Sequence, residues 1–162
     1  MPHASLWDIV TGLPRLIVGQ ALHPLSRIFR GSMKHPESQA ELADLVNKTR
    51  SHQIRAGYTH RFIQLMFVAA GDRVFCRRYQ YNEPSWHSVF LSDPGGQVRL
   101  DGVEVNITAT VPHDMEAVMP FVDQAYADAL KKLGASFMLA GAVEPRAQQS
   151  TLEIKFSEGS VE

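Results

Sequence analysis

The densest group of residues able to do chemistry lies between Arg73 and Pro94. Arg77 and Arg78 are consecutive, so on a strand their side chains leave opposite faces and one must face the interior or a cavity. A buried arginine needs an anionic partner, and its planar guanidinium suits a carboxylate or a phosphate. Two interpretations stay open: a structural salt bridge for one arginine with the other in solvent, or an anion-binding site.

A short helix is expected to start just after this segment, at Ser85-Trp86-His87. Helix amino termini bind anions through unpaired N–H groups, Trp86 offers a stacking face, and His87 titrates near neutral pH. The alternative is structural, with Ser85 as the cap of the helix, Trp86 in the core and His87 exposed.

His60 and Arg61 form a second polar group, at the start of an expected strand where they could reach the mouth of a cavity. A lone histidine there is more often a surface or hydrogen-bonded residue, and this alternative stays open. No His-x-x-x-His or His/carboxylate pair at helical spacing supports a metal site. Cys76 is the single cysteine; it excludes an intrachain disulfide, fits a reducing compartment and is expected in the core.

The composition narrows the class of protein. A chain of 162 residues with 44% hydrophobic and 20% charged residues suits one domain around one core. A net charge of −1 and a pI near 6.7 give no electrostatic case for a nucleic acid partner.

Hydrophobic periodicity and turn residues predict the elements that position these side chains. A helix begins at Ser38, where Glu41 completes a capping box. Residues 52–57 are expected to be a connection into the sheet, and Asp101-Gly102 is a hairpin turn. The predicted strands are 59–70, which should be central, 73–81, 97–100, 103–111 and 151–156. Two further helices are predicted over 85–91 and 114–133, the second with a break or fresh start at Pro120. The pattern over 135–147 is ambiguous and predicts neither a helix nor a strand.

Antiparallel strands in the middle of the chain, flanked by helices, indicate an α+β protein that is mainly β. We expect a split β-barrel, an arrangement that closes its edges on itself. The expected organisation is an N-terminal helical extension over residues 1–57, a barrel domain over 58–157 with the helix 114–133 inserted, and a tail over 158–162.

The apolar segment 5–33 is expected to form one or two amphipathic helices. Charged residues and prolines interrupt it, so it matches neither a spanning helix nor a secretory signal. We therefore expect a cytoplasmic protein without a membrane span. The simpler role for the segment is packing onto the barrel or onto a second subunit; a lid over a ligand pocket and a helix at a membrane surface are the alternatives.

Residues 58–133 resemble the FMN-binding split-barrel superfamily, which includes the pyridoxamine-phosphate-oxidase-like and deazaflavin-dependent nitroreductase-like proteins; the closest match is an uncharacterised family within it. Asn82–His87, followed by Phe90-Leu91 and Asp93-Pro94, resembles the deazaflavin-type signature of Pro-x-Trp, a short helix and x-Pro before a hairpin. Three other segments also match. Arg73–Tyr79 is similar to the family's strand that ends in an arginine, and Thr151–Phe156 is similar to its closing strand. Gln124–Tyr126 is similar to the Ala-Tyr in the helix that follows the barrel strands.

The resemblance implies a homodimeric flavin- or deazaflavin-dependent oxidoreductase that acts on a small organic substrate. Relatives often place a basic residue where the short helix begins, to hold the phosphate of the cofactor, whereas Trp86 and His87 stand there in this chain. The phosphate role would then pass to another arginine. The residues assigned to cofactor binding are Arg77, Arg78, Arg61, Ser85 and Trp86, and those assigned to catalysis are His87, Tyr79 and His60.

The same residues allow an alternative without any cofactor, which is as defensible as FMN or a deazaflavin. Such a barrel would bind or transform an aromatic or carboxylated small molecule, either as a binding protein or as a non-redox enzyme with a histidine as acid or base. Haem binding, known among split-barrel relatives, is a third hypothesis, with His60 and His87 as the candidate ligands.

Overall fold

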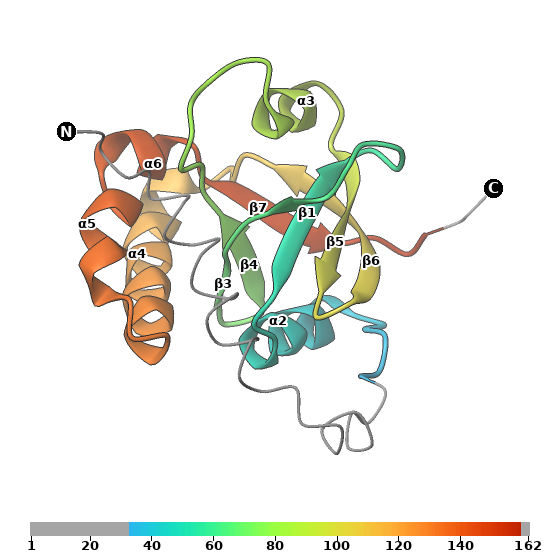
Figure 1. Cartoon of the computed structure of the whole chain (residues 1–162), viewed down its shortest axis with the longest axis horizontal. Helices are drawn as coiled ribbons and strands as arrows, with labels where there is room; N and C mark the ends of the chain where they lie inside the picture. Colours follow the sequence, from blue (N-terminus) through green and yellow to red (C-terminus); the bar gives the residue numbers. More distant parts are fainter. Residues whose placement is uncertain (1–32, 160–162) are drawn as a thin grey trace, which may run out of the picture. The chain divides into compact units, whose positions relative to one another are not determined.

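The computed structural model describes residues 33–159, and those from Pro36 onward form one compact unit. Its centre is a single antiparallel sheet of seven strands in the order β2-β1-β5-β6-β7-β4-β3 (Figure 1). The strands are β1 (His52–Ala56), β2 (Ile63–Gln64), β3 (Phe67–Ala70), β4 (Arg73–Cys76), β5 (Gly95–Leu100), β6 (Val103–Thr110) and β7 (Leu152–Phe156). The helices are α2 (Gln39–Lys48), α3 (Trp86–Ser92), α4 (Met115–Lys132), η2 (Ser136–Met138), α5 (Leu139–Ala142) and α6 (Pro145–Gln149).

The sheet curls because its two edge strands are joined directly along the chain. β2 and β3 lie at opposite edges of the sheet, yet only Leu65 and Met66 separate them in sequence. At this corner the N–H of Leu65 donates to the carbonyl oxygen of His52 (3.0 Å), and the N–H of Phe67 donates to Nδ1 of the same histidine (3.1 Å). The predicted fold class, an α+β split barrel of antiparallel strands with flanking helices, is confirmed.

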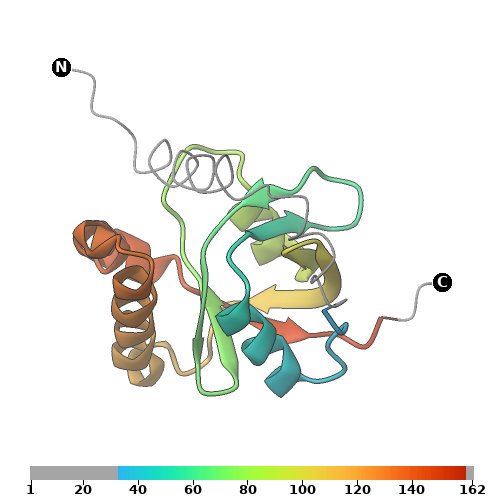
Figure 2. The same ribbon diagram turned by 60° about the horizontal axis from the view of Figure 1, so that its bottom comes forward.

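Alternate residues of β3 and β4 face two different cores. Phe67, Val74 and Cys76 point into the barrel and pack with the apolar face of α2. Figure 2 brings α2 forward and shows it against this end of the sheet. Val68 and Phe75 point outward, on the side covered by α4, whose buried residues are Val118, Val122, Tyr126 and Leu130. The predicted core position of Cys76 is confirmed.

Local signals set the ends of the main helices. The Oγ of Ser38 accepts a hydrogen bond from the N–H of Glu41 (3.2 Å), which confirms the predicted cap of α2. At the end of α4, Gly134 adopts φ +70°, and the N–H groups of Gly134 and Ala135 donate back to the carbonyls of Lys131 and Leu130. This pair of bonds satisfies carbonyls that would otherwise be unpaired at the helix end.

The break predicted at Pro120 is wrong, because α4 runs through it without interruption. Pro120 is exposed and lies close to the start of the helix. A proline there removes one bond to the carbonyl of Glu116, and water can hydrate that carbonyl.

Three predictions about the strands are also wrong. Residues 52–57, expected to be a connection, contain β1, so the barrel strands begin before the expected boundary at residue 58. Residues 59–70, expected to be one central strand, contain the two short edge strands β2 and β3. Both faces of that run are apolar because it passes round the corner between the edges, and not because it is central. The strand predicted over 73–81 stops at Cys76.

The amphipathic helices expected over 5–33 fall on residues 1–32, outside the described residues. The tail predicted from residue 158 is described only as far as Gly159.

His52 at the corner makes the stability of the fold dependent on pH. Nδ1 accepts the N–H of Phe67, so the neutral ring carries its proton on Nε2, which lies 3.2 Å from the carbonyl oxygen of Thr49. Burial lowers the pKa of His52 below its usual value near 6.5. The stabilisation from neutral His52 is therefore complete above the pKa of the unfolded chain and is lost as the pH falls towards the folded pKa.

When the pH falls from about 7.5 to about 5, we expect the free energy of unfolding to fall further in the wild type than in His52→Gln. The difference should be about 1.4 kcal/mol for each pH unit by which burial lowers the pKa of His52. Urea denaturation at both pH values measures this. His113→Gln, at an exposed histidine, is the control and should follow the wild type. An equal pH dependence in wild type and His52→Gln would contradict the role given to His52.

Candidate functional site

The structure places Arg77 on the outer side of the barrel, beneath the C-terminal helices, where its side chain is fully buried. Nε donates to Oγ1 of Thr151 (3.0 Å), Nη1 donates to the carbonyl oxygen of Ala142 (2.8 Å), and Nη2 contacts Sδ of Met119 (3.0 Å). Nη1 also lies 2.7 Å from Oδ1 of Asp123. All three guanidinium nitrogens thus have protein partners.

The contact between Arg77 and Asp123 is an ion pair but not a hydrogen bond of good geometry, because the Oδ1 of Asp123 accepts no hydrogen bond. The other oxygen of Asp123 accepts from Nε2 of Gln148 (2.8 Å). The guanidinium also lies 5.1 Å from the ring of Tyr126. This environment is that of a structural salt bridge beneath a helical layer.

Arg78 organises the link between β4 and α3. Its N–H donates to Oγ of Ser150 (2.9 Å), and its Nε donates to the carbonyl oxygen of Gln80 (3.0 Å). Nη1 pairs with Oε1 of Glu83 at 2.8 Å; the Arg78 side chain is 10% exposed, whereas that of Glu83 is 51% exposed. Arg78 is therefore a nearly buried cation whose carboxylate partner is at the surface.

Ser85 caps α3, as predicted. Its Oγ accepts the N–H of Ser88 (3.2 Å), and Oγ of Ser88 accepts the N–H of Ser85 (3.2 Å). The Ser85 hydroxyl also lies 3.0 Å from Oε2 of Glu83. Hydrogen bonds lower the pKa of Glu83; the larger effect comes from Ser88 and the next from Arg78. The start of α3 and the Arg78 ion pair therefore belong to one polar network.

His87 and Trp86 lie next to this network. His87 is buried, so the alternative in which it is exposed is wrong. Its Nε2 lies 2.9 Å from the carbonyl oxygen of Ser150. A carbonyl only accepts, so Nε2 carries the proton and Nδ1 is the acceptor of the neutral ring. Burial lowers the pKa of His87. The half-buried Trp86 ring lies edge-on to His87 (5.6 Å between ring centroids) and packs against the barrel core.

Tyr79 lies in the same link and also packs against the barrel core. Burial raises the pKa of Tyr79, and a hydrogen bond with Tyr126 lowers it by less. The phenol therefore stays protonated at neutral pH.

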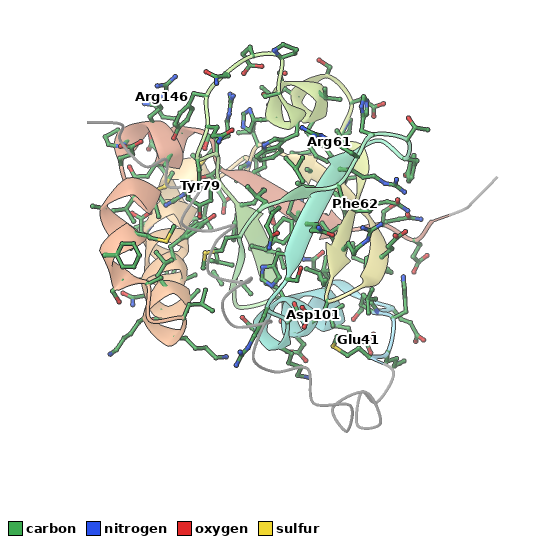
Figure 3. The ribbon with its side chains drawn as sticks, viewed as in Figure 1. Glu41, Arg61, Phe62, Tyr79, Asp101 and Arg146 are labelled. Carbon is green, nitrogen blue, oxygen red and sulfur yellow. The ribbon has the colours of Figure 1, made fainter. Side chains whose placement is uncertain are left out.

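His60 and Arg61 lie elsewhere, on the exposed loop between β1 and β2. Figure 3 shows Arg61 near the upper end of the sheet, well separated from Tyr79. The structure therefore brings together Arg78, Ser85, Trp86 and His87. The Tyr79 hydroxyl interacts with Tyr126 of α4 instead, and His60 and Arg61 lie on another loop.

A second set of side chains, which no sequence pattern indicated, lies on the outer face of β1 and β5. Arg55 and Gln97 are paired across these strands, as are Gln53 and Arg99. The ring of Phe62, from the same loop as Arg61, lies 4.4 Å from the guanidinium carbon of Arg55 and 3.8 Å from that of Arg99. We call Arg55, Phe62, Gln97 and Arg99 the outer-face cluster. The alternation of His52, Ile54 and Ala56 was the available signal for β1, but it is too short to stand out.

A shallow groove of about 390 Å³ runs between the β3–β4 hairpin and α4. Ala70, Gly71, Arg73, Phe121 and Asp128 are among its lining residues, and no predicted site residue is. Arg73 is bound by both Asp114 and Glu153, so the groove offers no uncompensated cation.

Within residues 33–159, no cluster of three or more histidine, cysteine or acidic side chains is arranged to hold a metal ion. In the same range no helix combines the length and apolar character needed to cross a membrane.

The sheet, its corner and its helical covers define a protein of the α+β split-barrel class. Residues 40–154 match the family described as "Uncharacterized protein conserved in bacteria (DUF2255)", and the chain belongs to this family. No curated protein matches it. A Listeria innocua structure named "Putative Pyridoxamine 5'-phosphate oxidase" is similar at 12% sequence identity and a TM-score of 0.44, over 74% of this chain and 91% of that one. Membership of the FMN-binding superfamily stays a prediction.

Proposed function

We propose that the protein is a flavin- or deazaflavin-dependent oxidoreductase, homodimeric as the motif resemblance implies, which binds its cofactor at the barrel end covered by α3. The cofactor would supply hydride transfer, and the protein would supply binding and orientation. The proposal depends mainly on one observation: the nearly buried guanidinium of Arg78 is neutralised by an exposed carboxylate.

An exposed carboxylate can be exchanged for the phosphate of a ligand, because Glu83 regains water when it leaves. Arg78 would then keep an anionic partner throughout, which a buried cation requires. The same exchange does not fit Arg77, since its side chain is fully buried beneath α4 and its guanidinium also contacts Thr151, Ala142 and Met119. The residues present therefore fit a phosphate at Arg78 and not at Arg77.

The neighbouring groups have separate roles in this proposal. Trp86 provides the flat apolar surface for a ring system, and Ser85 holds the start of α3 next to Arg78. His87 offers Nδ1 as an acceptor, because its other nitrogen is bound by Ser150. Tyr79 stays protonated, and it would donate to a ligand only by exchanging its hydrogen bond with Tyr126. Arg61 and His60 are exposed on another loop and would contribute only to a ligand that extends that far.

Titration with FMN and with a deazaflavin, followed by absorbance and thermal shift, tests the proposal. We expect Glu83→Gln to tighten binding about threefold, because it removes the competing carboxylate, and Arg78→Gln to weaken it about tenfold. Trp86→Ala should weaken binding without altering the ion pair. Glu116→Gln, on the exposed side of α4, makes the same change in charge and should have no effect.

Weaker binding in Glu83→Gln than in Glu116→Gln would contradict the exchange at Arg78, and no binding of either cofactor would contradict the redox function. Light scattering of the purified protein tests the homodimer separately.

A cofactor-free function is the second candidate, favoured by the fact that Arg77 and Arg78 both have carboxylate partners already. The barrel would then bind or transform an aromatic or carboxylated small molecule, with His87 as acid or base. Thermal stabilisation by aromatic carboxylates that is lost in Arg78→Gln and kept in Arg55→Gln, without any by flavins, distinguishes this function, because a ligand that binds only the folded state raises its stability.

A further inference from the structure

The outer-face cluster is held in place by a chain of hydrogen bonds across three strands. Asn106 on β6 accepts from Nε2 of Gln97 (2.7 Å) through its Oδ1, which directs Oε1 of Gln97 towards Arg55. That oxygen accepts from both Nε (2.8 Å) and Nη2 of Arg55. Three side chains from β1, β5 and β6 therefore fix one guanidinium on the surface of the sheet.

This arrangement orients Arg55 without neutralising it. Its partner is an amide, and in the part of the chain that the structure describes no carboxylate pairs with it. Its third nitrogen, Nη1, makes only a long contact of 3.5 Å with the carbonyl oxygen of His60. One nitrogen of an oriented cation thus remains largely available to an acceptor.

The surrounding charges add to this effect. Arg99 pairs with Glu104 (2.6 Å) and reaches towards Gln53 (3.4 Å). Arg61 lies on the same loop as Phe62 and is exposed. Among the residues that the structure describes, Glu104 is the one carboxylate that pairs with Arg99 or Arg55, so the two arginines are only half neutralised.

The aromatic ring narrows the chemistry of the ligand. Phe62 is half-buried against both guanidinium groups, so its position relative to the cations is fixed. A planar ring can extend this stack, while an attached anionic group reaches Nη1 of Arg55. A compact inorganic anion would use the charge but not the ring, and a neutral aromatic molecule would use the ring but not the charge.

We infer that the outer-face cluster is a binding site for a planar organic anion of the aromatic carboxylate class. Its cations are oriented before the ligand arrives, which lowers the entropy that binding costs. The site is separate from the Arg78 network and does not depend on the cofactor proposed there.

The test is calorimetric titration of the full chain with 2-naphthoate, which has both the ring and the charge. We expect saturable binding that is weakened about tenfold in Arg55→Gln, through loss of a charge-assisted hydrogen bond, and weakened in Phe62→Leu. Glu104→Gln should tighten binding, because it removes the carboxylate that competes for Arg99. Lys132→Gln, which removes a charge at the exposed end of α4, should leave the affinity unchanged.

Two further probes separate the contributions of ring and charge. Cyclohexanecarboxylate, which is anionic but not planar, and 2-naphthylmethanol, which is planar but neutral, should each bind at least tenfold more weakly than 2-naphthoate. Equal affinity in wild type and Arg55→Gln, or equal losses in Arg55→Gln and Lys132→Gln, would overturn the inference, as would no saturation with 2-naphthoate. Loss in Arg78→Gln without loss in Arg55→Gln would assign the ligand to the Arg78 network instead.

Discussion

Asp123→Ala is expected to lower the free energy of unfolding by about 3 kcal/mol, because it leaves the guanidinium of Arg77 buried without a counter-charge. Arg77 is fully buried, and Asp123 is its carboxylate partner at 2.7 Å. The carbonyl of Ala142 and the hydroxyl of Thr151 remain as acceptors, but they carry no negative charge. Urea denaturation of wild type and variant measures the loss.

Asp128→Ala is the matched control, since Asp128 is exposed on the same helix and its carboxylate accepts a hydrogen bond from Nε2 of Gln124 (2.9 Å). It should cost less than about 0.5 kcal/mol. The double variant Arg77→Met/Asp123→Ala should be more stable than Asp123→Ala, because it removes the unpaired charge as well. A similar small loss for Asp123→Ala and Asp128→Ala would show that the ion pair does not support the helical layer.

Gly96→Ala is expected to destabilise the protein by about 3 kcal/mol, because α3 and β1 leave no room for a side chain there. A Cβ at this position would lie 2.5 Å from the carbonyl oxygen of Arg55 and 2.7 Å from the ring of Phe90. The ring can rotate, but the carbonyl belongs to the paired strand β1, where Gly96 faces Ala56. The sheet or α3 must therefore move.

Gly95→Ala provides the comparison within the same strand. A Cβ on Gly95 meets nothing nearer than Oδ1 of Asp93 at 3.6 Å, which is ordinary contact. We expect its melting temperature to stay close to that of wild type, while that of Gly96→Ala falls by more than about 10 °C. Equal melting temperatures for the two variants would mean that α3 does not pack against the sheet in this way.

The candidate site was predictable only in part. The sequence indicated the helix start at Ser85 and the presence of two neighbouring arginines, because capping residues and charged pairs act over a few positions. It did not indicate which acid each arginine meets. Asp123 lies on a helix far along the chain from Arg77, whereas Glu83 is five residues from Arg78.

The outer-face cluster could not be predicted, for a related reason. Arg55, Phe62 and Arg99 meet because β1 pairs with β5 and the chain folds back through the loop after β1. No periodicity connects these positions. β1 itself was missed, since five residues that include a histidine, a glutamine and an arginine carry too weak a hydrophobic alternation.

By itself, the sequence determined the local structure: the hairpin turn at Asp101-Gly102, the alternation along β6, the stop of α4 at Gly134 and the caps at Ser38 and Ser85. Each of these depends on the conformational preferences of residues only a few positions apart. Only the tertiary structure decided the corner at Leu65 and Met66, the burial of both arginines and the cationic face around Phe62. These features depend on which distant segments the curl of the sheet brings together, and that pairing minimises exposed apolar surface and unpaired backbone groups over the whole domain.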